Sequence, residues 1–199
     1  YWTTQLADLP AELTLPTDRP RRSTPSYAGG AVQIALSPAL HARLQELARA
    51  QGATLFMLLQ AAVAALLTKI GAGHDIPIGA PVAGRTEAAL ESLVGFFVNT
   101  LVLRIDTGGD PTFLELLARA RMTCLAAYAH QDLPFERLVE RLDPPRTAGR
   151  QPLFQTMVVL QPSAPPLVRP SGMRSVALAP DVRTTKFDLA FSFVERQAT

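Results

Sequence analysis

The spacing of hydrophobic residues changes from a period of two to a helical period early in the chain. Hydrophobic side chains alternate with polar ones over residues 31–37, which predicts a strand. Ser37 followed by Pro38 is typical of a helix N-terminus, because serine caps the first turn and proline fits its first position. Gly52 predicts the end of that helix, and Thr54 predicts the cap of a second helix that is apolar on most sides.

Four further stretches predict strands. These are IPIGAPV (76–82), FFVNTLVLRID (96–106), FQTMVVLQ (154–161) and DLAFSFVE (188–195), and the proline-rich stretch 162–170 separates the last two. Both faces of 96–106 are largely apolar, so we expect this strand to lie inside a sheet. Because helical patterns alternate with the strands, the sequence predicts an α/β fold with a mixed sheet flanked by helices.

A helix is also predicted to start at Asp110–Pro111. The apolar residues expected to face inward from it are Phe113, Leu114, Leu117, Ala120 and Leu125. Cys124 lies on an apolar face of the same helix, and we expect it to be an inert core thiol.

The stretch HQDLPFERLVERL (130–142) raises a question of chemistry. Its apolar residues fall at helical spacing from Phe135, Pro134 suits the first turn of a helix, and Asp132 could cap that helix or favour its positive end. His130 and Asp132 could instead form a catalytic dyad, which would need a nucleophile and a third orienting group. The structural interpretation already explains the spacing, so we favour it over the dyad.

Composition narrows the classes of function. The chain has 199 residues, 48% hydrophobic and 18% charged, as expected for a globular protein, and its formal charge is only +2. No basic run is interleaved with aromatic residues, which argues against a nucleic-acid partner. The most apolar segment, 55–67, is shorter than the about 20 residues that cross a bilayer, and residues 1–8 do not resemble a signal peptide.

Cysteine and histidine usage points away from disulfides and metals. Cys124 is the single cysteine, so no disulfide can form within the chain, which fits a reducing cytoplasm. The histidines His41, His74 and His130 are scattered, so no metal site is predicted. The chain opens and closes in mid-pattern, and we expect it to be part of a longer protein.

Several polar residues interrupt or end apolar strands. Asn99 and Thr100 lie within one strand, Gln161 ends another, and Asp188 precedes a third. Each could be a satisfied core group or could line a cavity, since a buried polar group needs a partner. Arg85, just after a strand, could be a loop charge or the bidentate partner of a carboxylate elsewhere.

Six stretches in order resemble one family, the condensation domains of nonribosomal peptide synthetases. They are YWTTQLADLPAELTLPTDRPR, IGAPVAGR, VGFFVNTLVLR, HQDLPFERLVERL, RQPLFQTMVVLQ and TKFDLAFSF, and they cover almost the whole chain. Related epimerisation domains share the fold, but FFVNT is more similar to the condensing branch.

The resemblance implies a fold similar to chloramphenicol acetyltransferase, with two halves around a tunnel. The family's catalytic motif, HHxxxDG, lies in the first half, and this chain contains no HH pair. The resemblance therefore identifies residues 1–199 as a partial condensation domain, its C-terminal subdomain, with 10–30 as a loop or linker within it. It implies that the catalytic histidine lies outside this chain.

The resemblance also implies roles for individual residues. Arg85 would pair with the aspartate of HHxxxDG and hold the motif loop. Asn99 and Thr100 would lie near the tunnel, and Gln161 would lie near the reaction centre and orient the attacking amine. The remaining motif residues would be structural: His130, Asp132, Pro134 and Asp188.

The implied reaction joins a carrier-tethered aminoacyl or peptidyl donor to a carrier-tethered aminoacyl acceptor in an amide bond. The phosphopantetheine arms would belong to the partner carriers, so we expect no cofactor bound by the chain itself. The expected partners are the upstream and downstream peptidyl carrier proteins, the adjacent adenylation domain and the N-terminal half of the domain. We expect the isolated chain to be inactive and prone to self-association. The alternatives are a noncatalytic module that docks carrier proteins, a relative of the epimerisation domains, and a trimeric acyltransferase, which the missing histidine motif disfavours.

Overall fold

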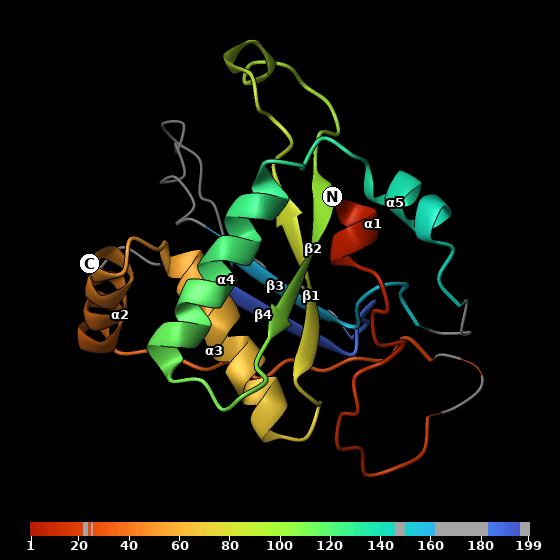
Figure 1. Ribbon diagram of the computed structural model, residues 1–199, viewed down its shortest axis with the longest axis horizontal. Coiled ribbons are helices and arrows are strands. Elements are labelled where there is room, and N and C mark those ends of the chain that lie inside the picture. The colour runs from red at the N-terminus through yellow and green to blue at the C-terminus, as the bar shows by residue number, and fades with distance from the viewer. Residues whose placement is uncertain (22–23, 25, 146–149, 162–182, 196–199) are drawn as a thin grey trace, which may run out of the picture.

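Helices alternate with strands along the computed structural model, which describes residues 1–21, 24, 26–145, 150–161 and 183–195. The α/β class predicted from the sequence is confirmed (Figure 1). The elements are α1 (Trp2–Gln5), α2 (Pro38–Ala50), α3 (Leu55–Lys69), β1 (Asp75–Val82), the 3₁₀ helix η1 (Ala88–Leu90), β2 (Asn99–Asp106), α4 (Phe113–Tyr128), α5 (Phe135–Leu142), β3 (Thr156–Gln161) and β4 (Leu189–Val194).

The four strands form one mixed sheet in the order β2-β1-β3-β4. β1 and β2 are antiparallel, with Asp75 opposite Asp106 and Val82 opposite Asn99. β3 runs parallel to β1, and β4 runs parallel to β3. The carboxyl ends of β1, β3 and β4 therefore lie at the same end of the sheet, together with the start of β2.

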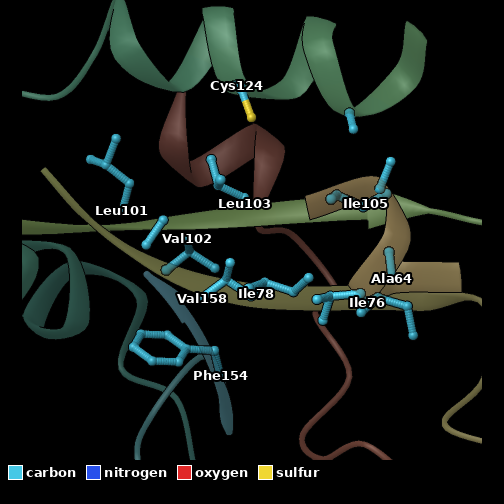
Figure 2. Close-up of a cluster of buried hydrophobic side chains, with 14 of the residues drawn as sticks. Ala64, Ile76, Ile78, Leu101, Val102, Leu103, Ile105, Cys124, Phe154 and Val158 are labelled. Atoms are coloured by element: carbon cyan, nitrogen blue, oxygen red, sulfur yellow. The ribbon is translucent and has the colours of Figure 1, made fainter. Parts of the chain in front are cut away.

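One face of the sheet packs against α3 and α4. Leu103 of β2 and Cys124 of α4 face each other across this interface, and both are fully buried (Figure 2). Leu101 and Ile105 have the same parity as Leu103 and are also buried, as expected for a strand whose alternate residues share one face. This packing holds β2 in place although only one of its edges pairs with another strand.

The opposite face of the sheet holds an aromatic cluster and the chain that leaves α1. The ring of Phe154 lies directly on Gly79, where an added Cβ would come within 2.2 Å of the ring, so this crossing requires glycine. Phe187 stacks on Phe154 with the ring centroids 5.5 Å apart, and Phe135 meets Phe154 edge to face with the centroids 5.7 Å apart. This cluster ties α5 to the start of β3 and to the chain that enters β4.

The predicted helix N-termini at Ser37 and Thr54 are confirmed. The Ser37 hydroxyl accepts a hydrogen bond from the amide of Leu40 at 3.2 Å, and Thr54 accepts one from Met57 at 3.2 Å. Gly52, just past α2, has a φ of +60°, the left-handed conformation in which glycine often ends a helix.

The predicted strand over 31–37 is wrong for the described structure, since no element is assigned there. Val32 and Ile34 are 88% and 78% exposed. Alternation predicts only the extended shape of a strand, while a sheet also needs a hydrogen-bonding partner, and the described residues offer none to this segment. Within residues 10–30, the described part contains an isolated bridge, Ala28 to Thr184, and no helix or strand, as expected of a loop. The stretch 162–170 lies outside the described residues.

The strand predicted over 96–106 begins later and lies at a different place in the sheet. β2 starts at Asn99, and Phe96 before it is 91% exposed. The prediction that this strand lies inside the sheet is wrong, because β2 is at the edge of the described sheet. Both of its faces are apolar because each is covered by the chain, whereas only one of its edges is paired.

The helix predicted from Asp110–Pro111 starts two residues later than expected. Its cap is Thr112, which forms a reciprocal pair of hydrogen bonds with Glu115. Leu117 and Ala120 face inward as predicted, but the prediction is wrong for three residues that are 38% to 47% exposed: Phe113, Leu114 and Leu125.

Within the described residues, no single helix is long and apolar enough to cross a membrane. α2 and α3 reach the required length and hydropathy only as a pair, and they are bent by 103° where they meet.

Candidate functional site at one end of the sheet

The candidate site lies at the end of the sheet where β1 and β3 finish and β2 begins. Arg85 follows β1 by three residues, Asn99 and Thr100 open β2, and Gln161 closes β3. The sheet topology therefore brings the four residues expected near a reaction centre to one end of the molecule. Residues 83–98, which join β1 to β2, rise above this end of the sheet as a long loop (Figure 1).

Arg85 holds the 83–98 loop together from within. Its guanidinium donates hydrogen bonds to the carbonyls of Leu90 and Leu93, the latter at 2.7 Å, and lies 4.2 Å from the centroid of the Phe97 ring. No carboxylate among the described residues pairs with Arg85. The neck of the loop is narrow, because a Cβ on Gly84 (φ +64°) would come within 1.8 Å of the Phe97 carbonyl oxygen.

Asn99 connects the neck of this loop to the turn between α4 and α5. Its Nδ2 donates to the carbonyls of Gln131 and Leu133, both at 2.8 Å. Its Oδ1 accepts from the amides of Thr100 at 2.8 Å and of Phe135 at 3.0 Å. The carboxamide thus uses all its hydrogen-bonding capacity on the protein itself, and it caps the first turn of α5.

Thr100 and Gln161 are placed differently from Asn99. Thr100 is half-buried opposite Pro81 of β1. Gln161 is exposed at the end of β3, and its carbonyl accepts a hydrogen bond from the Glu195 amide at 3.2 Å. The Gln161 side chain is therefore open to a molecule that approaches this end of the sheet.

His130 and Asp132 do not form a dyad in the structure. The His130 Nδ1 is hydrogen-bonded to the carbonyl of Ala126 at 2.9 Å, and its ring stacks on Tyr1 with the centroids 4.1 Å apart. Asp132 is exposed and does not cap α5, whose N-cap is Pro134 and whose first amide bonds to Asn99 instead. These contacts are those of a helix boundary.

Asp188 joins the last strand to the long N-terminal loop. Its carboxylate forms an ion pair with Arg21, and its amide donates to the carbonyl of Gln155 at 3.0 Å. Asp188 precedes β4, whereas Gln161 of β3 lies beside Val194, the last residue of β4. Asp188 and Gln161 are therefore at opposite ends of the sheet.

The 83–98 loop exposes an apolar surface to solvent. Val94 and Phe96 are almost fully exposed, and Leu93 and Val98 are each about half exposed. Several exposed apolar side chains on one loop are typical of a binding interface. We call these four residues the apolar loop patch.

Two polar interactions were missed from the sequence, the first at the end of the sheet opposite the candidate site and the second near the candidate site. Arg104 of β2 forms a bidentate ion pair with Asp75 and also donates to the carbonyls of Gln5 and Ala7, which raises the pKa of its guanidinium, chiefly through the hydrogen bonds to Asp75. Like Asn99, Arg104 is a polar residue within an apolar strand, and this signal could have singled it out.

The second missed interaction lies where the chain leaves β4. Glu195 accepts hydrogen bonds from His41 at 3.0 Å and from Gln45 at 3.1 Å, and thereby fixes α2 to the end of the sheet. Glu195 is 154 positions from His41 and 150 from Gln45 in the sequence, so no local pattern indicates the contact.

The described residues contain no group of three or more acidic, histidine or cysteine side chains that could hold a metal ion. A groove of about 580 Å³ lies between the chain that follows α1, the end of α5 and residues 150–153. It adjoins the beginning of β3, so it is at the opposite end of that strand from Gln161. None of the expected site residues lines it, and we therefore do not assign the candidate site to this groove.

The family model of the condensation domain matches residues 1–199. The chain therefore belongs to the condensation-domain family of nonribosomal peptide synthetases. It is 54% identical over 198 residues to a probable non-canonical nonribosomal peptide synthetase, CymA, of Salinispora arenicola, and 51% identical over 195 residues to a dimodular nonribosomal peptide synthase of Bacillus subtilis. These alignments cover 100% and 98% of this chain but only 2% and 8% of the two relatives.

Solved structures agree with this assignment. The X-domain from teicoplanin biosynthesis is similar over 99% of this chain and 44% of its own, with a TM-score of 0.90 and 35% identity. A four-domain nonribosomal peptide synthetase, holo-AB3403, matches 80% of this chain and 12% of its own, with a TM-score of 0.77 and 29% identity. The resemblance to condensation domains inferred from the sequence is confirmed.

Proposed function

We propose that residues 1–199 form the C-terminal half of a condensation domain that joins two carrier-tethered substrates through an amide bond. The observation that carries the proposal is the arrangement of polar and apolar residues at one end of the sheet. The polar residues expected near the reaction gather at one end of the sheet beneath the apolar loop patch, which lacks a covering partner among the described residues. The 44% coverage of the similar X-domain chain supports a half-domain.

The proposed reaction is attack of an amine on a thioester. The amine nitrogen of the acceptor bonds to the thioester carbonyl carbon of the donor, the carbon–sulfur bond breaks, and the sulfur of the donor's phosphopantetheine arm leaves as a thiolate. The amine loses a proton in the process, and the group that accepts it is expected in the HHxxxDG motif of the preceding half. Holding both tethered substrates in place would supply most of the rate gain, because it makes a bimolecular step effectively unimolecular.

Arg85 is proposed to hold the HHxxxDG loop through its aspartate. A guanidinium has five N–H donors. In the described structure two nitrogens of Arg85 donate to the carbonyls of Leu90 and Leu93. Donors remain for a carboxylate of the proposed N-terminal half. The Phe97 ring and the two carbonyls orient the guanidinium in advance, which lowers the entropy lost on pairing.

Gln161 is proposed to orient the attacking amine. Its side chain is exposed at the same end of the sheet, and an amide oxygen accepts hydrogen bonds from an amine. Asn99 supports the site in a different way, by fixing the α4–α5 turn, because its own carboxamide has no free donor or acceptor.

The proposed partners are the carrier proteins on either side, an adenylation domain and the N-terminal half of the domain. The relatives are peptide synthetases many times longer than this chain, which supports partners within one polypeptide. Carrier arms would deliver phosphopantetheine thioesters, so the chain needs no cofactor of its own.

A second candidate function is a noncatalytic docking module. One similar structure, with a TM-score of 0.88, is a complex of the teicoplanin X-domain with OxyB, so a domain of this fold binds another protein there. Binding of a carrier or another protein without turnover would favour this candidate.

The experiment that tests the first candidate uses the full polypeptide that carries residues 1–199, with both carriers loaded. Arg85→Ala should lower the rate of amide formation by about tenfold or more, which corresponds to about 1.4 kcal/mol. The matched control is Arg137→Ala, since the Arg137 side chain is 72% exposed and, within the described part of the chain, pairs only with Glu140 on its own helix. Combining Arg85→Ala with a neutral replacement of the motif aspartate should cost little more than either change alone, because paired residues are not additive. An unchanged rate in Arg85→Ala would reject the proposed role.

A further inference from the structure

The end of β3 that carries Gln161 is held by a strand on one side only. β1 pairs with β3 at Thr156 and Met157, the first two residues of β3, whereas the pairing of β3 with β4 continues to Gln161 opposite Val194. Beyond Met157, in the described sheet, β4 is therefore the strand that holds the backbone of β3. Because β4 is itself at the edge of the described sheet, its own end needs a support from elsewhere in the fold.

Glu195 supplies that support where the chain leaves β4. Its amide donates to the carbonyl of Gln161 at 3.2 Å, which continues the pairing of the two strands by one hydrogen bond. One oxygen of its carboxylate, Oε1, accepts from His41 at 3.0 Å and from Gln45 at 3.1 Å. His41 and Gln45 are four positions apart on α2, so they share one face of that helix. Glu195 therefore connects the backbone of Gln161 to α2.

α2 is itself fixed to the core. The Ser37 hydroxyl caps its first turn, and the helix packs against α3. Ala48 of α2 is buried, and Leu44 and Leu47 are partly buried against the same core. α3 in turn packs on β1 and on α4. The position of Glu195 at the end of β4 is thus set through two helices that rest on the core.

We propose that Glu195, held by His41 and Gln45, is a positioning residue for the condensing reaction. By fixing the end of β3, it keeps the exposed side chain of Gln161 where the acceptor amine arrives. The inference rests on the proposed function, and in particular on the proposed role of Gln161. Rigid support is needed there, because a group that orients a reacting amine loses much of its effect when it is displaced by about 1 Å.

The geometry of the contact indicates a substitution that should preserve it. Both hydrogen bonds from α2 end on Oε1 of Glu195, and the side-chain oxygen of a glutamine also has two lone pairs. Glu195→Gln therefore keeps an acceptor for His41 and Gln45, whereas Glu195→Ala removes it. The backbone bond from residue 195 to Gln161 is available in both variants, so the two differ only in the link to α2.

The test measures the single-turnover rate of amide formation by the full polypeptide that carries residues 1–199, with donor and acceptor carriers loaded. Glu195→Ala should lower this rate about tenfold, since a displacement of about 1 Å can cost about a hundredfold and the pairing with β4 remains. Glu195→Gln should retain most of the rate. In a Gln161→Ala background, Glu195→Ala should cost little more, because the two residues act as a unit. A general loss of structure would instead slow both backgrounds equally.

The matched control is Glu140→Ala, which removes a carboxylate that is 64% exposed on α5 and should leave the rate unchanged. A normal rate in Glu195→Ala beside a slow Gln161→Ala would reject the positioning role and leave the proposed function in place. Equal costs of Glu195→Ala in both backgrounds, or a Glu195→Gln rate as low as that of Glu195→Ala, would also reject it. A normal rate in Gln161→Ala would overturn the role of Gln161 and the positioning role together. If the unsubstituted polypeptide forms no amide, the proposed function itself fails, and the positioning role fails with it.

Discussion

Asn99 shows how a single side chain can organise this end of the molecule. Its carboxamide bonds to backbone groups of Thr100, Gln131, Leu133 and Phe135, so two segments more than 30 residues apart are held by one amide. The sequence indicated that a polar residue within an apolar strand needs partners, which is what the structure has. The sequence could not identify the partners of Asn99, because they are backbone groups that only the fold brings close to its side chain.

The role of Asn99 can be tested by an isosteric change of charge. Asn99→Asp keeps the acceptor for the Phe135 amide but sets a carboxylate against the carbonyls of Gln131 and Leu133. We expect the free energy of unfolding to fall by about 1–3 kcal/mol, the cost of unsatisfied buried groups. Denaturant unfolding measures it, and hydrogen exchange should be fastest at the first turn of α5.

The matched control is Gln161→Glu, the same change of charge at an exposed residue, which should alter the unfolding free energy little. The defect of Asn99→Asp should lessen as the pH falls and the new carboxyl becomes protonated, since it can then donate to a carbonyl. Equal stability of both variants near neutral pH would contradict the role of Asn99.

Cys124 is the second residue whose environment makes a sharp prediction. It is fully buried between α4 and β2, and burial raises the pKa of its thiol from 9.0 to about 12. Since only the thiolate reacts with alkylating reagents, this shift lowers the reactive fraction about a thousandfold at moderately alkaline pH. We expect the folded chain to resist iodoacetamide near pH 8 and the unfolded chain to react readily. Rapid labelling of the folded chain, followed by mass spectrometry, would show that the thiol is not in the core.

At the scale of elements, the helices were predictable and the sheet was less so. The caps at Ser37 and Thr54 depend on residues three positions away, so the sequence displays them directly. Strand 31–37 and the place of β2 were predicted wrongly, because pairing depends on chain that is distant in the sequence. The same limit applies to the candidate site. The sequence singled out its four residues, but only the order of the strands shows that they lie at one end of the sheet.

The start of α4 gives a test at this scale. Thr112, and not the predicted Asp110, caps the helix by a reciprocal pair of hydrogen bonds with Glu115, which lowers the pKa of the Glu115 carboxyl, chiefly through the bond from the Thr112 hydroxyl. Thr112→Ala should reduce the free energy of unfolding by about 1 kcal/mol.

The control for this cap is Thr86→Ala, at an exposed threonine of the 83–98 loop. The Thr112 effect should be larger at neutral pH and should shrink as the pH falls through the lowered pKa of Glu115, because the protonated carboxyl no longer accepts the bond from the Thr112 hydroxyl in the same way. The bond from the Glu115 amide to the Thr112 hydroxyl does not titrate and should remain. A pH-independent difference would show that the bond from the Thr112 hydroxyl to the Glu115 carboxylate does not stabilise α4.

At the scale of the whole molecule, the exposed apolar loop patch is the main feature left without a partner in the described structure. Val94 and Phe96 stand above the candidate site and are almost fully exposed. In a whole condensation domain we expect the preceding half to cover them. Without that half, exposed apolar surface should instead drive self-association.

Sedimentation velocity of residues 1–199 should therefore show a concentration-dependent rise in mass. Val94→Glu together with Phe96→Glu should shift the chain towards monomer, because charge opposes burial of the loop. Arg137→Glu, an exposed change far from the loop, should leave the distribution unchanged. A clean monomer at high concentration would mean that the loop is not an uncovered interface.

The central claim is that this chain holds one half of a condensing site. The most direct test compares residues 1–199 alone with the polypeptide that also carries the preceding HHxxxDG half, using the same loaded donor and acceptor carriers in both assays. We predict that mass spectrometry will detect the carrier-bound amide product only with the longer polypeptide. Amide product formed by residues 1–199 alone would contradict the account, because it would require a catalytic group within this chain.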